Sequence, residues 1–104
     1  YSLESLDALE ELLVLTWRDG DAGELLKNRA ARYLGEVFRK RLGGRWDLCL
    51  KDPKYLYFKR PVISGYSPLG IEFCPIEVVA NFLHSRRACT LRTTVDSHLE
   101  FRQP

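Results

Sequence analysis

The stretch RYLGEVFRKRLGGRWDL, residues 32–48, combines a helical apolar rhythm, five basic side chains, a glycine pair and a tryptophan. Its apolar residues recur every three or four positions up to Leu42, as they do on one face of an α-helix. Gly43-Gly44 follows, and glycine readily adopts the left-handed conformation that ends helices. RWDL then alternates as strands do. The stretch therefore predicts a long helix that ends at the glycine pair and continues into a strand.

Two helices are predicted on the N-terminal side of the glycine pair. Asp21 and Glu24 have the spacing of a capping box, so the long helix is expected to run from Asp21 to Leu42. Residues 2–18 predict an earlier helix that Asp19-Gly20 would end. The short connection and the broad apolar faces predict that the two helices form an antiparallel pair.

Residues after the glycine pair predict a small sheet and further helix. RWDLCLKD (45–52) and KYLYFKRPVIS (54–64) read as two strands, and LGIEF (69–73) is a candidate third. A helix is expected to begin at Pro75 and run to about His84. A box-like start at Thr93 predicts a last helix. Residues 1–104 are thus predicted to form a single α+β domain, with a helix pair, an antiparallel sheet of two or three strands and one or two C-terminal helices.

Charge is distributed unevenly along the chain, although the net charge is only +2. Residues 1–26 hold seven acids and one base, whereas residues 27–60 hold eleven bases and three acids. Such blocks are typical of a nucleic-acid surface or of two elements that attract each other. A net charge of +2 is small for a dedicated nucleic-acid-binding domain.

Basic side chains form a stripe along the predicted long helix and just beyond it. Phosphate contacts are the functional interpretation of this stripe, and Trp46 could then stack on a base. Glu36 lies within the stripe, four residues from Arg32 and four from Lys40, as in a solvated helix face with ion pairs. A solvated face is therefore the expectation, with a protein partner and nucleic acid as alternatives. The candidate anion or nucleic-acid contacts are Arg29, Arg32, Arg39, Lys40 and Arg45.

Structural roles are expected for Gly35, Gly43, Gly44 and Trp46. Glycine inside a helix costs about 1 kcal/mol relative to alanine. Close approach of another backbone is therefore expected at Gly35. Trp46 follows the glycine pair, where its ring can fill the groove between helix and sheet, although stacking on a ligand is an alternative.

Cysteine and histidine give weak indications of chemistry. Cys49, Cys74 and Cys89 are too few and too widely spaced for a disulfide scaffold, so reduced thiols in the cytoplasm are expected. No spacing brings two metal ligands together, so no metal and no cofactor are predicted. Cys74 precedes a helix that begins with proline, and a cysteine enzyme that uses His84 or His98 as its base is the minor alternative.

The pattern YLGE, GG and W is carried here by Tyr33, Leu34, Gly35 and Glu36, then Gly43, Gly44 and Trp46, with Pro75 downstream. It resembles a family of small bacterial proteins built on a domain of unknown function. The resemblance covers about residues 20–101, and its first half is the specific part. It implies a bacterial α+β domain and transfers no activity. Some small proteins of this kind are similar in size to immunity proteins, which bind and block a toxin.

Leu12 and Leu15 suggest a function, since they widen the apolar arc of the first helix beyond what one neighbour covers. Together with the charge blocks they predict a non-catalytic protein-binding domain that associates with itself or with another protein, as an immunity protein does. The sequence contains no run of about 18 apolar residues, which is the length that crossing a membrane requires. Its start also lacks the basic region of a signal peptide. The chain is therefore expected in the cytoplasm and not at a membrane.

Overall fold

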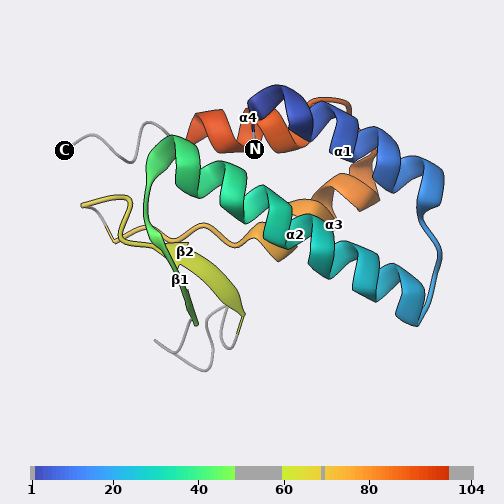
Figure 1. The fold of residues 1–104 in the computed structure, drawn as a ribbon, viewed down its shortest axis with the longest axis horizontal. Coiled ribbons are helices and arrows are strands. Elements are labelled where there is room, and N and C mark those ends of the chain that lie inside the picture. Colours follow the sequence, from blue (N-terminus) through green and yellow to red (C-terminus); the bar gives the residue numbers. More distant parts are fainter. Residues whose placement is uncertain (1, 49–59, 69, 99–104) are drawn as a thin grey trace.

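The computed structural model describes residues 2–48, 60–68 and 70–98. In this part of the chain, four helices and a two-stranded sheet form in the order α1, α2, β1, β2, α3, α4 (Figure 1). The predicted α+β layout is confirmed: of the two or three strands expected the described residues form two, and of the one or two C-terminal helices they form two. The bounds are α1 Leu3–Thr16, α2 Asp21–Leu42, β1 Arg45–Leu48, β2 Pro61–Ser64, α3 Pro75–Ser85 and α4 Thr90–Ser97.

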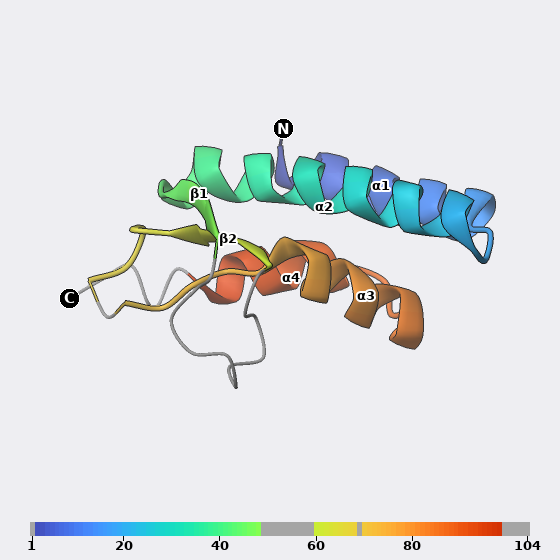
Figure 2. The same cartoon turned by 90° about the horizontal axis from the view of Figure 1, so that it is seen from below.

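The helices form two layers. Antiparallel α1 and α2 lie side by side in one layer and α3 and α4 lie in the other, with the sheet near the C-terminal end of α2 (Figure 2). α2 packs on α3, and α1 packs on α4. Every helix contributes fully buried apolar side chains to the core between the layers. They include Leu6, Leu13, Leu34, Phe38, Val79, Leu91 and Val95.

Two contacts set the register of the α1–α2 pair. The Tyr33 hydroxyl lies 2.8 Å from the Ser5 hydroxyl. At the other end of the pair, the ring of Trp17 and the backbone of Arg18 lie so close to Gly23 that a Cβ there would overlap the Arg18 carbonyl. The first half of α1 therefore lies beside the second half of α2, and the end of α1 lies beside the start of α2.

The predicted end of the first helix is wrong. α1 ends at Thr16, and Trp17 is already extended with ψ 134°. Close packing of residues 17 and 18 over Gly23 explains this early end. Gly20, with φ 84°, is the N-cap residue of α2 and does not cap α1. Asp21 accordingly lies in the first turn of α2 and not at its N-cap, where no side-chain capping hydrogen bond forms, so the predicted capping box of Asp21 and Glu24 is wrong.

The sheet is antiparallel and short. Trp46 pairs with Ile63 and Asp47 with Val62. Residues 49–52 and 54–59 of the two predicted strands lie outside the described residues. Pro61 is the first residue of β2, where its missing N–H removes little from the ladder. The candidate third strand is wrong, since in the described part of 69–73 only Phe73 pairs, in an isolated bridge with Ile63.

The two C-terminal helices are present as predicted, but one begins earlier. α3 runs from Pro75 to Ser85, close to the predicted range. α4 begins at Thr90 instead of Thr93. Glu10 of α1 explains this difference, because its buried carboxylate accepts hydrogen bonds from the backbone N–H groups of Cys89 at 2.8 Å and Leu91 at 2.9 Å. None of the described helices combines the length and apolar character that crossing a membrane requires.

Candidate functional site

Three leucines of the α1–α2 layer are exposed. Leu15 has 82% of its surface exposed, Leu25 54% and Leu12 51%. The described part of the chain therefore does not cover Leu12 and Leu15. Leu25 belongs to α2 and was missed in the sequence, although it lies four residues before Arg29 and thus on the face of the basic stripe. We call Leu12, Leu15 and Leu25 the leucine patch.

Opposite charges accompany the leucine patch. α1 carries four acidic residues and no basic one, whereas α2 carries six bases. Two acids of α1, Glu4 and Asp7, pair with Arg92 of α4, at 3.5 and 3.1 Å, and Glu10 caps α4. Glu11 is exposed beside Leu12. These acids of α1 thus contact α4, which lies outside the basic block of residues 27–60.

The basic residues of the predicted stripe do not share one environment. Arg39 donates to Glu36 at 3.1 and 3.2 Å and to the carbonyl of Gly44 at 3.3 Å, so it joins the end of α2 to the turn that follows. Arg45 lies on β1, with its guanidinium close to Gly65. Arg29, Arg32 and Lys40 are exposed on α2. The five candidates are therefore spread over α2, its C-terminal turn and the sheet.

Trp46 lies where α2 meets the sheet. Its ring lies so close to Gly35 that a Cβ at position 35 would overlap two ring atoms. The close approach expected at Gly35 is thus made by an indole ring and not by another backbone. The indole N–H donates to Glu36 at 3.1 Å, and the half-buried ring packs against the core.

The glycine pair shapes the same corner. Gly43 has φ 87°, and its N–H bonds to the carbonyl of Arg39 at 2.8 Å, which ends α2. Gly44 has φ 93°, and a Cβ there would lie 2.8 Å from both Ile63 and the carbonyl of Ser64. Positive φ disfavours other residues at both positions. The turn therefore brings β1 directly against the end of α2.

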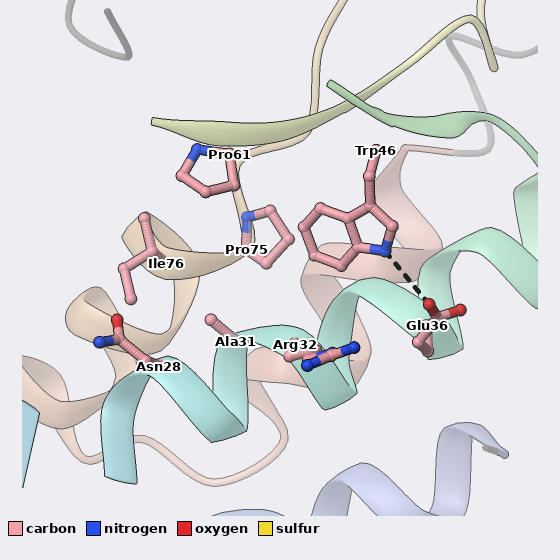
Figure 3. A pocket seen from close by; sticks show the side chains of 8 residues that line it. All are labelled: Asn28, Ala31, Arg32, Glu36, Trp46, Pro61, Pro75 and Ile76. Atoms are coloured by element: carbon pink, nitrogen blue, oxygen red, sulfur yellow. Dashed lines mark hydrogen bonds between the residues drawn. The ribbon is translucent and has the colours of Figure 1, made fainter. Parts of the chain in front are cut away.

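A hollow of about 580 Å³ opens between α2, the sheet and the start of α3. Figure 3 shows the rings of Pro61, Pro75 and Trp46 along one side and α2 along the other. We call it the Trp46 pocket. Of its residues, only Arg32 and Trp46 are candidate ligand contacts in the sequence, because α2, the sheet and α3 come together through packing between distant segments. The lining residues are Asn28, Ala31, Arg32, Glu36, Trp46, Pro61, Pro75 and Ile76.

The candidate cysteine and histidine residues lie in different surroundings in the described part of the chain. Cys74 is buried, with its Sγ 3.8 Å from the carbonyl oxygen of Pro61, so a dissolved substrate has little access to it. His98 packs edge-on against Phe73, with ring centroids 5.0 Å apart, and its Nδ1 lies 2.8 Å from the carbonyl of Thr94. His84 lies exposed in the last turn of α3. Within the described ranges, no three His, Cys, Asp or Glu residues are grouped to hold a metal ion, and Cys49 lies outside those ranges.

Comparison of the chain with protein-family models, curated proteins and solved structures finds no match.

Proposed function

We propose that this chain is a non-catalytic protein-binding domain that pairs with a second copy of itself through the outer surface of the α1–α2 layer. The exposure of the leucine patch is the observation that carries the proposal. Burial of apolar surface is the main driving force for association between proteins, and large exposed apolar groups on one surface are typical of interaction sites. Leu15 is the most exposed of the three leucines.

A second copy fits this surface because of the spacing of its residues. Glu11 and Leu15 are four positions apart on α1, and Leu25 and Arg29 are four positions apart on α2. A two-fold axis parallel to the helices would lay α1 of each copy over α2 of the other, in antiparallel orientation. Leu15 would then face Leu25 of the second copy while Glu11 faces its Arg29.

Charge favours this arrangement over one in which the two α1 helices meet. Two copies of α1 packed on each other would bring acidic helices together, which weakens association. Packing α1 on α2 places an acidic helix against a basic one twice, once on each side of the axis. Contacts related by a two-fold axis close into a dimer and do not propagate into a fibre.

Sedimentation equilibrium with three proteins tests the proposal. We expect the unaltered chain to be dimeric at about 50 µM and Leu15→Glu to be monomeric, since burying the new carboxylate is unfavourable. Leu48→Glu is the matched control, because Leu48 is exposed on β1, away from the leucine patch, and this variant should remain dimeric. A monomeric unaltered chain, or a Leu15→Glu variant that still dimerises, would refute the proposal.

A further inference from the structure

The Trp46 pocket has the size and lining of a small-molecule site. Its volume of about 580 Å³ lies within the range of roughly 300–1,000 Å³ that is usual for ligand pockets. Most of its lining is apolar: the indole of Trp46, two proline rings, Ala31 and Ile76. Among the described lining residues, the polar ones are Asn28, Arg32 and Glu36, all on α2. An apolar wall faced by a few polar groups on one helix is the usual design of a ligand site.

The two charged residues of the pocket, Glu36 and Arg32, differ in whether they are free to bind a ligand. Glu36 is already engaged, because its carboxylate accepts from the Trp46 indole at 3.1 Å and from Arg39 at 3.1 and 3.2 Å. Arg32 is exposed and, within the described ranges, makes no hydrogen bond or ion pair. The guanidinium of Arg32 is therefore available to pair with a ligand.

The apolar wall of the Trp46 pocket favours ligands that have a flat apolar ring. In Figure 3 the ring of Trp46 lies beside those of Pro61 and Pro75, opposite the α2 residues Ala31 and Arg32. Because the indole N–H is used by Glu36, the side chains of Trp46, Pro61 and Pro75 offer ring surfaces and no free donor. Flat apolar rings pack well against such surfaces.

We propose that the Trp46 pocket binds a small organic acid in which a flat apolar ring carries a carboxylate. The ring lies against Trp46, Pro61 and Pro75, and the carboxylate pairs with the guanidinium of Arg32, an arrangement that favours paired hydrogen bonds. Arg32 lies on the same helix as Leu25 of the leucine patch, and the inference does not rest on the proposed dimer.

Nuclear magnetic resonance of the two indole N–H groups tests this site in the unaltered chain. Trp46 is in the pocket, and Trp17, at the end of α1, is an internal reference. The probes are phenylacetate, phenylacetamide and phenethylamine, which share a ring and differ in charge. We expect phenylacetate to shift the Trp46 resonance saturably and to bind at least about tenfold more tightly than the amide or the amine, because only the acid pairs with Arg32.

Two variants separate the carboxylate contact from simple burial of a ring. Arg32→Gln should bind phenylacetate and phenylacetamide equally, whereas Arg87→Gln, which removes an exposed arginine after α3, should retain the tenfold preference. The inference is overturned if phenylacetate leaves the Trp46 resonance unmoved at about 10 mM. It is also overturned if both indoles shift alike, or if Arg32→Gln retains the preference for the acid.

Discussion

Position 35 lies inside α2, where glycine costs about 1 kcal/mol relative to alanine. From the sequence, this cost correctly indicates that something approaches the helix closely. It cannot show what approaches, since Trp46 is eleven residues away and reaches Gly35 only after the turn at Gly43-Gly44. The indole ring of Trp46 thus joins helix and sheet in two ways. It packs in the space that a Cβ at position 35 would occupy, and it donates a hydrogen bond to Glu36.

The contact between Trp46 and Gly35 predicts that Gly35→Ala lowers stability when Trp46 is present and raises it when Trp46 is replaced by alanine. In the unaltered chain Gly35→Ala should lower the free energy of unfolding by about 1–3 kcal/mol, because the new methyl group overlaps the ring. In Trp46→Ala, which itself loses about 3 kcal/mol, the same change should raise stability by about 1 kcal/mol, since helix propensity then dominates. Urea unfolding of the four proteins measures this cycle. Gly35→Ala destabilising both backgrounds equally would show that the ring does not determine the glycine.

Helix ends are predictable from sequence where their signals are local. The end of α2 is predicted correctly because Gly43 and Gly44 follow the last apolar residue. The end of α1 and the start of α4 are predicted wrongly because contacts between distant residues set them. Trp17 and Arg18 pack against Gly23 of α2, which ends α1 early. Glu10 accepts hydrogen bonds from the first amides of α4, some 80 positions away in sequence.

Glu10 is predicted to be a main stabiliser of α4. Glu10→Ala should lower the free energy of unfolding by about 3 kcal/mol, because it leaves the N–H groups of Cys89 and Leu91 without their carboxylate. Glu24→Ala is the control, since Glu24 is exposed and makes only a surface ion pair with Lys27 in the described part of the chain, and it should change stability by less than about 1 kcal/mol. Thermal or urea unfolding distinguishes the two. Equal stabilities of these variants would contradict the capping role.

At the scale of the whole molecule, the sequence predicts the class of fold and the uncovered surface, but not the pocket. The spacing of the apolar residues and the positions of the turn-forming residues are enough to predict the order of helices and strands along the chain. Leu12 and Leu15 are recognisable as surplus because they extend an already complete apolar face. The Trp46 pocket joins α2, β1, β2 and α3, so its lining depends on packing that no local pattern encodes. The same is true of Leu25, which adds to the leucine patch only when α1 and α2 lie side by side.

The central claim is that α1 of one copy packs on α2 of the other, and mixing two charge-reversed variants tests it most directly. Glu11→Arg and Arg29→Glu should each be monomeric at about 50 µM, because each places like charges across both halves of the interface. A one-to-one mixture should form a heterodimer, since every arginine at position 11 or 29 then faces a glutamate. Sedimentation equilibrium of the mixture is the measurement. A mixture that sediments as two monomers, or single variants that dimerise as well as the unaltered chain, would contradict the claim.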